Sequence, residues 1–483
     1  MLFNLIFVFL LLTILSLIML INCNLQQYRL IALSSSGLVF LAALSLLFDF
    51  NINNFYFQNI IIYNIGLEFL NVYFSLGLDG VSLFFFILSS LLIFICLIFI
   101  WEEPLFKVYS LNLLFINLFL LLIFSVMDLL LFYIFFEAIL IPMFLIIGLF
   151  GSRERKIRAV FFFFFYTLIG SLCFLIAILY LFSIVGTVNL EYLLQYSFTD
   201  KEQYILWLAF FLSFAAKIPL FPFHIWLPEA HVEAPTVGSV LLAGILLKLG
   251  VYGFLRFSLT LFPQASLFFS PLIYFLGVIG VLYTSFTAIR QTDLKRIIAY
   301  SSIAHMNLVT IGIFSFNVLG VEGAILQSIS HGFVSSAMFL LIGILYTRYH
   351  SRFLFYYGGL VHMMPLYSSF FLVFTLANIA LPLTSSFISE FLLLSGIFKT
   401  NFIACFLAML GVIICGSYAL WLYNRVCFGN LKIINTRLFY DLTLREVLVL
   451  FPLVILVLFL GVYPQFFIAY IHLSSLNLIL DLI

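Results

Sequence analysis

The sequence predicts an all-α polytopic membrane protein with about fourteen transmembrane helices, in which two inverted five-helix repeats carry broken helices at positions seven and twelve. Three observations support this prediction. Of the 483 residues, 65% are hydrophobic and only 8% are charged, whereas soluble domains are ~45–50% apolar and ~25% charged. Apolar runs long enough to cross a bilayer, ~20 residues each, recur along the chain. Prolines interrupt two of these runs, and the two lie five spans apart.

The apolar runs give approximate boundaries for the spans. The first run lacks a basic start and a small-residue cleavage site, so we interpret it as a retained span and not as a removable signal or transit peptide. The predicted spans are residues 2–21, 30–48, 76–100, 111–126, 129–150, 159–185, 204–226, 236–257, 272–288, 296–316, 321–346, 366–397, 402–426 and 447–468, with a short apolar tail after them.

The basic residues give an independent check, because Lys and Arg collect on alternate loops of membrane proteins. With this division, one side holds Arg29, Lys107, Arg153, Arg155, Lys156, Arg158, Arg290, Lys295, Arg296, Arg348, Arg352, Arg425, Lys432, Arg437 and Arg445. The other side holds only Lys201, Arg256 and Lys399. A wrong helix count in the middle of the chain would destroy this separation. Both termini then face away from the basic side.

Composition also excludes several classes of protein. The net charge is +1, and no basic tract suggests nucleic acid. No GxGxxG or Walker-type loop is present, and the cysteines form no CxxC pair or zinc-spaced cluster. We therefore expect no cofactor and no metal on this chain, and we expect most cysteines to be apolar packing residues. The six cysteines are Cys23, Cys96, Cys173, Cys405, Cys415 and Cys427.

The two interrupted spans lie at residues 217–228 and 381–390. Proline removes a backbone donor and clashes with the preceding turn, so such breaks survive in a membrane only where protein or water satisfies the freed groups. Paired breaks in corresponding positions indicate an inverted repeat. The predicted segments are 1–110 with the first three helices, 111–258 and 259–430 with the repeats, and 431–483 with the last helix. The alternative is two ordinary proline kinks.

Four charged residues lie inside apolar spans: Glu137, Lys217, Lys248 and Glu390. A charge at membrane depth costs at least ~2.5–3.5 kcal/mol, so several in one chain indicate an ion or proton pathway. We predict that these four are proton carriers and that Glu137 pairs with Lys217, which would lower the cost of burying both. The alternative is that they form static structural ion pairs.

Two histidines stand beside hydroxyl residues within predicted spans. Imidazole can transfer protons near neutral pH, so His305 and His331 are candidate relay groups, with packing roles as the alternative. Four further titratable residues flank the first break, and we expect them to lie in a solvated loop. These are His224, Glu229, His231 and Glu233.

The longest motif of the chain, residues 217–236 running on to Lys248-Leu-Gly, resembles the core signature of the antiporter-like subunits of respiratory complex I. The resemblance covers roughly residues 75 to 430. It continues through the segments Gly77-Leu-Asp-Gly80, Phe136-Glu137-Ala, residues 290–296 and residues 301–305.

This resemblance implies a fourteen-helix proton-pumping subunit of a membrane arm. Glu137 and Lys217 would be its coupled pair and Lys248 its central relay. Glu390 would be the terminal carrier, and a carboxylate there separates this chain from the related chains 2 and 5. His305 and His331 would lie along a polar axis between these groups.

The resemblance also implies partners and a location. NADH, FMN, iron–sulfur clusters and ubiquinone would be bound by partner subunits. The neighbours would be other membrane-arm subunits, especially chains 2 and 5, and membrane lipids. The abundance of Phe, 64 residues, and the absence of an import signal fit synthesis inside an organelle. We therefore expect the mitochondrial inner membrane, with basic loops toward the matrix and both termini toward the intermembrane space.

Two positions depart from the family pattern, because this chain has Leu383 and Ser389 where the family usually has glycine. The second break is therefore expected to have a different shape. Two other functions remain open. The chain could be an independent cation/proton antiporter, or a structural scaffold that only stabilises a membrane assembly.

Overall fold

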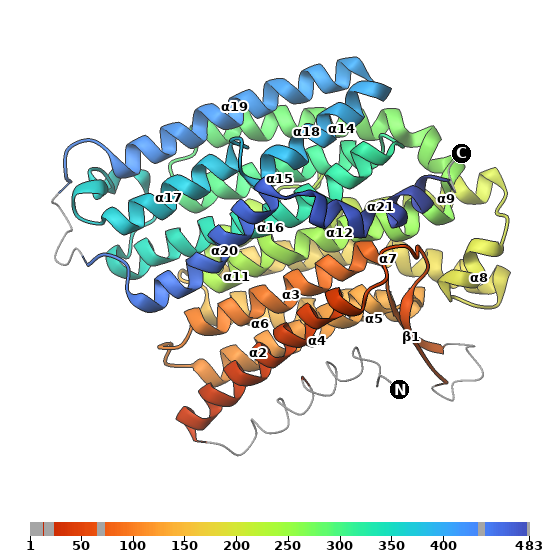
Figure 1. Cartoon of the computed structure of the whole chain (residues 1–483), viewed down its shortest axis with the longest axis horizontal. Helices are drawn as coiled ribbons and strands as arrows, with labels where there is room; N and C mark the ends of the chain where they lie inside the picture. Colours follow the sequence, from red (N-terminus) through yellow and green to blue (C-terminus); the bar gives the residue numbers. More distant parts are fainter. Residues whose placement is uncertain (1–12, 14–23, 65–72, 433–439, 481–483) are drawn as a thin grey trace. The chain divides into compact units, whose positions relative to one another are not determined.

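The computed structural model describes residues 13, 24–64, 73–432 and 440–480, which form helices and one β-hairpin (Figure 1). The predicted helical membrane class is confirmed, since ten helices among the described residues are long and apolar enough to cross a membrane. The count of fourteen and the repeat boundaries stay predictions. The predicted first span, residues 2–21, lies outside the described residues, as do Cys23 and Arg437.

The chain divides into two compact units, and the first comprises residues 1–217, 248–268 and 469–483. Its helices pack largely in chain order, α2 on α3, α3 on α4, and α7 on α9. The elements are α2 (Leu25–Asp49), β1 (Gln58–Asn64), β2 (Tyr73–Leu78), α3 (Gly80–Phe99), α4 (Phe106–Ser125), α5 (Leu129–Ala138), α6 (Leu140–Phe150), α7 (Lys156–Val185), α8 (Leu190–Gln195), α9 (Asp200–Lys217), α12 (Leu247–Gly253), η3 (Phe254–Ser258), α13 (Leu259–Leu261) and most of α21 (Gln465–Leu480).

The hairpin is an element that the sequence interpretation missed. Strands β1 and β2 pair antiparallel, with Gln58 opposite Leu78, and an irregularity follows Gln58. Residues 76–78, predicted as the start of a span, belong to β2. The helix α3 begins at Gly80 because the Asp79 carboxylate caps it, accepting a hydrogen bond from Ser82 N at 2.9 Å. A capping carboxylate at a helix N-terminus both satisfies a free N–H and complements the helix dipole.

The second unit comprises residues 218–247 and 269–468. Helix α16 forms its centre, buried throughout its apolar window and packed against α11, α15, α17, α18 and α20 (Figure 1). The elements are α10 (Trp226–Glu233), α11 (Thr236–Leu241), η2 (Leu242–Leu246), most of α14 (Pro263–Arg290), α15 (Leu294–Ile313), α16 (Val318–Tyr349), η4 (Leu354–Tyr356), η5 (Leu360–His362), α17 (Pro365–Asn378), α18 (Ser385–Thr400), α19 (Phe402–Cys427) and α20 (Leu444–Val462).

Both predicted helix breaks are confirmed. Helix α9 ends at Lys217 and α10 begins only at Trp226, while α17 ends at Asn378 and α18 begins at Ser385. The end of the last predicted span, 447–468, was also wrong, because that span is cut short. Helix α20 ends at Val462 and α21 starts at Gln465, because Pro464 disfavours helical backbone in the residue before it.

Candidate functional site

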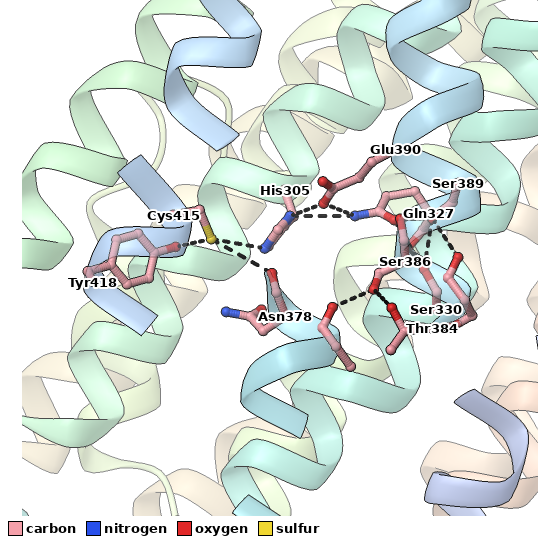
Figure 2. Close-up of polar contacts among 12 residues, drawn as sticks. His305, Gln327, Ser330, Asn378, Thr384, Ser386, Ser389, Glu390, Cys415 and Tyr418 are labelled. Atoms are coloured by element: carbon pink, nitrogen blue, oxygen red, sulfur yellow. Dashed lines mark hydrogen bonds and ion pairs between the residues drawn. The ribbon is translucent and has the colours of Figure 1, made fainter. Parts of the chain in front are cut away.

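The second unit contains a cluster of polar side chains around Glu390, on α18 just after the second break. His305 Nδ1 of α15 lies 3.1 Å from Glu390 Oε1, and Gln327 Nε2 of α16 donates a hydrogen bond to the same oxygen at 3.0 Å. All three residues are at most 6% exposed. Two helices therefore supply donors to one buried carboxylate that a third helix carries (Figure 2).

Close packing of α16 and α18 brings Gln327 to Glu390. Glycines line the crossing: a Cβ on Gly323 would lie 2.6 Å from Leu393 N, and a Cβ on Gly396 would lie 2.6 Å from Gly320 N. Small residues allow two membrane helices to approach closely. The glycine positions thus determine which side chains of α16 can reach the Glu390 carboxylate.

The amide of Gln327 is held by hydroxyl groups on its oxygen side. Ser389 Oγ donates to Gln327 Oε1, and Ser330 Oγ lies 3.1 Å from the same atom. Because a carbonyl oxygen can only accept, these contacts orient the Nε2 donor toward Glu390. Ser389, one of the two departures from the family pattern, therefore takes part in the cluster.

The other ring nitrogen of His305 faces a second helix. His305 Nε2 lies 3.7 Å from Cys415 Sγ of α19, which lies 2.9 Å from Tyr418 Oη (Figure 2). Cys415 is therefore an exception among the cysteines, most of which were expected to be packing residues, since its thiol contacts polar groups on both sides. His331 of α16 is also near, with its ring centroid 5.7 Å from that of His305. The cluster thus runs from Glu390 through His305 to Tyr418.

The second departure, Leu383, lies in the break itself. Its φ is +79°, and Ala380 in the same turn has φ +62°, a left-handed backbone that costs an L-residue roughly 1–2 kcal/mol and glycine almost nothing. Helix α20 braces this turn, because a Cβ on Gly461 would lie 2.1 Å from Leu383 O. Ser386 Oγ donates to Ala377 O at the end of α17, a carbonyl that also accepts from Ala380 N at 3.1 Å, so the side chain ties α18 to the end of α17.

The first unit contains Glu137, Lys217 and Lys248. Glu137 stands in the last turn of α5, and Lys217 is the buried last residue of α9. The two side chains interact electrostatically. They form no direct ion pair in this structure. Lys217 Nζ lies instead 4.4 Å from the centroid of the Phe136 ring, a cation–π contact.

Lys248 is fully buried at the middle of the span Thr236–Leu261. The helix around it is irregular, because π-helical turns precede it at η2 and follow it at η3. Such turns interrupt the regular i→i−4 backbone hydrogen bonds of the α-helix, and they are frequent at functional sites. The sequence interpretation placed Lys248 correctly but gave no sign of these turns.

The residues expected in a solvated loop after the first break are mostly buried. Glu233 pairs with Arg352 at 3.0 Å with both side chains 3% exposed, and His231 stacks on Phe339 at 4.6 Å. His224 is also buried. The prediction was wrong for these residues because α10 packs on α15 inside the unit. Only Glu229 is half-exposed, in an ion pair with Arg296.

Metal-binding geometry is not found in the described ranges, where no group of three or more His, Cys, Asp or Glu could hold an ion. The arrangement instead suits proton transfer. A carboxylate, an imidazole with both nitrogens in polar contact, a thiol and a phenol form a connected row. Gln327, Cys415 and Tyr418 were missed as members; the spacing of Gln327 and His331, four residues apart on one helix face, could have indicated the first.

Fold and cluster together define a polytopic membrane protein with broken helices and buried ionisable groups, the class that moves ions. Residues 126–415 match the family described as NADH:quinone oxidoreductase/Mrp antiporter, transmembrane. A chain of respiratory complex I from Thermus thermophilus with bound NADH superposes with a TM-score of 0.89 at 31% identity, covering 99% of each chain.

Relatives named NADH-ubiquinone oxidoreductase chain 4 are more similar still. The chain is 55% identical over 415 residues to that of Marchantia polymorpha, covering 86% of this chain and 84% of the relative. It is 52% identical over 460 residues to that of Arabidopsis thaliana, covering 95% and 93%. The chain therefore belongs to the NADH–ubiquinone oxidoreductase chain 4 family.

Proposed function

We propose that this chain translocates protons as a multi-pass membrane-arm subunit of the NADH:ubiquinone oxidoreductase of the mitochondrial inner membrane. The observation that carries the proposal is the buried row Glu390–His305–Cys415–Tyr418, in which each group contacts the next. Oxidation of NADH and reduction of ubiquinone, with FMN and iron–sulfur clusters, would occur on partner subunits and supply the free energy. This chain contributes proton-carrying side chains.

In the second unit, His305 can exchange protons at both ring nitrogens. A proton moves from His305 Nδ1 to Glu390 Oε1 across 3.1 Å, which converts an ion pair into two neutral groups. His305 is left neutral with its remaining proton on Nε2, the nitrogen at which a proton arrived beforehand from the side of Cys415 and Tyr418. The ring returns to the Nδ1–H tautomer before the next transfer. Gln327 donates to the carboxylate and stabilises its ionised form, so it favours the state with the proton on His305.

In the first unit, Glu137 and Lys217 form the coupled pair. Bringing the carboxylate into contact with the ammonium stabilises the charged lysine, and separating them favours release of its proton toward Lys248. The structure, with the two groups interacting but not in direct contact, resembles the separated state of this switch. Water would carry the proton onward from Lys248.

Neutral replacement of the pair tests this proposal. Lys217→Met and Glu137→Gln in the assembled complex should lower the protons released per NADH oxidised, because each removes a proton-binding group. Matched controls are Lys399→Met and Glu202→Gln, which change residues outside the buried groups. A normal proton ratio in both Lys217→Met and Glu137→Gln would overturn the proposal.

The matched family also includes Mrp-type antiporters, so an independent cation/proton antiporter is the second candidate. The names of the most similar relatives favour the oxidoreductase. Co-purification with a hydrophilic redox arm, and proton release that requires NADH, distinguish the two. Cation exchange by the isolated chain without NADH would support the antiporter.

We also propose the setting of the chain. Its neighbours in the membrane arm are the related antiporter-like chains 2 and 5, and its basic loops bind anionic lipid. The basic loops face the matrix, and both termini face the intermembrane space, as the positive-inside rule predicts.

A further inference from the structure

The first unit contains a cavity of about 540 Å³ that none of the proton-carrying groups named above lines. Its outer residues are accessible, with Tyr56 66% exposed and Leu194 43% exposed, whereas Asp79 and Arg256 are buried. The lining residues that matter here come from the hairpin, α8, η3 and α21. They are Tyr56, Phe57, Asp79, Glu191, Arg256 and Asn477.

Asp79 and Arg256 form a buried ion pair at the cavity. Arg256 Nη2 lies 2.6 Å from Asp79 Oδ1, with the side chains 9% and 6% exposed, and the guanidinium carbon lies 4.6 Å from the centroid of the Phe57 ring. The same Asp79 oxygen caps α3 through Ser82 N. A buried pair of charges is costly to desolvate. Water in the adjoining cavity would lower this cost.

A tyrosine links this pair to the centre of the membrane helix. Arg256 Nε donates to Tyr252 Oη at 3.3 Å, and the Tyr252 ring is buried against Phe85 and Phe124. Tyr252 stands four residues after Lys248 within the regular helix α12. Residues four apart share one helix face. Lys248, Tyr252 and Arg256 therefore form a row of polar groups from the fully buried lysine to the cavity.

We propose that this cavity is a water-filled antechamber through which Lys248 exchanges protons with the aqueous phase, by way of Tyr252 and the Asp79–Arg256 pair. The inference rests on the proposed function and adds a route to it. With the predicted orientation, the cavity opens toward the intermembrane space, because Arg256 lies on the side away from the basic loops. It is then the release path of the first unit.

The proton step is balanced at each group. Protonated Lys248 gives a proton to Tyr252 Oη, directly or through a water, while the hydroxyl passes its own proton to the Asp79 carboxylate. Asp79, which lines the cavity, releases that proton to cavity water and returns to its ionised form. Tyr252 ends neutral, Lys248 ends as an amine, and one hydronium has formed. The Asp79 carboxylate cancels the charge of Arg256, which would otherwise repel the departing proton.

The charges of the cavity favour protons over a lipid headgroup. Two carboxylates, Asp79 and Glu191, line it together with one cation, Arg256. This excess of negative charge repels a lipid phosphate and attracts hydronium. An anionic lipid bound in the cavity is therefore an outcome that the experiment must exclude.

Three variants of the assembled complex test the route. Tyr252→Phe removes only the hydroxyl, and loss of a relay oxygen should slow the local proton transfer at least about tenfold, lowering protons released per NADH oxidised. Asp79→Asn keeps a capping oxygen for α3 but leaves Arg256 uncompensated, so it should also lower this ratio. The double variant Asp79→Asn/Arg256→Gln, balanced in charge, should restore at least half of the loss.

The control is Tyr274→Phe, which removes a hydrogen-bonded hydroxyl in the other unit, at Phe314 O. If the Asp79–Arg256 ion pair only stabilises the start of α3, Asp79→Asn and Asp79→Asn/Arg256→Gln should reduce the amount of assembled complex equally. The protons released per NADH oxidised by each assembled complex would then stay normal, which would contradict the route. A normal ratio in Tyr252→Phe, together with a lowered ratio in Lys248→Met, would overturn the route and leave the proposed function intact. Normal pumping in Lys217→Met and Glu137→Gln would overturn the function itself.

Access is tested by chemistry at the cavity wall. A membrane-impermeant maleimide added from the intermembrane side should label Leu194→Cys and lower the proton ratio by blocking the cavity. The same reagent on Asp200→Cys, an exposed residue outside the cavity lining, should label without effect. Full pumping after complete labelling of Leu194→Cys, or protection from labelling by an anionic lipid, would contradict a water-filled antechamber.

Discussion

At the scale of the residue, the side-chain amide of Gln327 decides what Glu390 meets. Its Nε2 donates to the Glu390 carboxylate only while its oxygen faces Ser389 and Ser330. A flipped amide would place an oxygen against the carboxylate, and two acceptors repel each other. Ser389 is thus a positioning residue at a position where the resemblance predicted glycine.

Ser389→Ala should therefore weaken the orientation of Gln327. A net hydrogen bond contributes about 1 kcal/mol, which corresponds to roughly fivefold in the population of the correct rotamer. We expect a change in the infrared carboxyl band of Glu390 and a lower pumping rate at unchanged assembly. The matched control is Ser395→Ala on the same helix, where the hydroxyl donates to Leu392 O of its own helix. Identical spectra for wild type and Ser389→Ala would refute the positioning role.

Asp128 offers a test of pH dependence outside the spans. Its Oδ1 accepts from Leu130 N and Leu131 N, but burial raises the pKa of the carboxyl to about 6 despite these hydrogen bonds. Because the pKa of the Asp128 carboxyl is higher in the folded than in the unfolded state, the protonated carboxyl stabilises the fold. This contribution to the free energy of unfolding is full below about pH 4 and is lost as the pH rises through about 6.

Asp128→Asn keeps the helix cap and cannot ionise. We expect the solubilised complex to lose less thermal stability between pH 5 and pH 8 than the wild type, by up to about 2–3 kcal/mol. The measurement is the midpoint of thermal denaturation at both pH values, with the exposed Asp200→Asn as control. A pH dependence unchanged by Asp128→Asn would show that this carboxyl does not titrate in the range.

At the scale of the element, the second break is a strained turn held by a neighbouring helix. Leu383 takes a left-handed backbone, and its side chain is 67% exposed, so little packing depends on it. Gly461 of α20 approaches the carbonyl of Leu383 without room for a Cβ. The shape of the break, and hence the position of Glu390 after it, depends on α20.

Leu383→Gly should relieve the strain and raise stability by about 1 kcal/mol, because glycine adopts this φ at no steric cost. Gly461→Ala should act in the opposite direction, since the new methyl group would displace the turn. Thermal denaturation of the complex measures both. A loss of stability in Leu383→Gly would mean that the exposed leucine makes contacts in the assembly that outweigh the strain.

At the scale of the whole molecule, the distribution of basic residues predicts the orientation in the membrane. Glu154→Cys, in the basic loop between α6 and α7, should react with an impermeant thiol reagent only from the matrix side. Asp200→Cys, at the first residue of α9, should react only from the intermembrane side. Each variant serves as the control for the other, because a reagent that leaked across the membrane would label both cysteines from either side. Reversed labelling would invert the predicted topology and the direction of the proposed release path.

The sequence by itself determined the membrane class, most spans, both helix breaks and the positions of Glu137, Lys217, Lys248 and Glu390 within apolar helices. These follow from local properties: apolar run length, proline chemistry and the cost of charge in hydrocarbon. Only the tertiary structure decided which groups meet. Contacts such as Glu390 with Gln327, or Asp79 with Arg256, join residues far apart in the chain, and no local pattern encodes the glycine-lined crossings that bring them together. For the same reason the sequence placed His231 and Glu233 in solvent, whereas packing of α10 on α15 buries them.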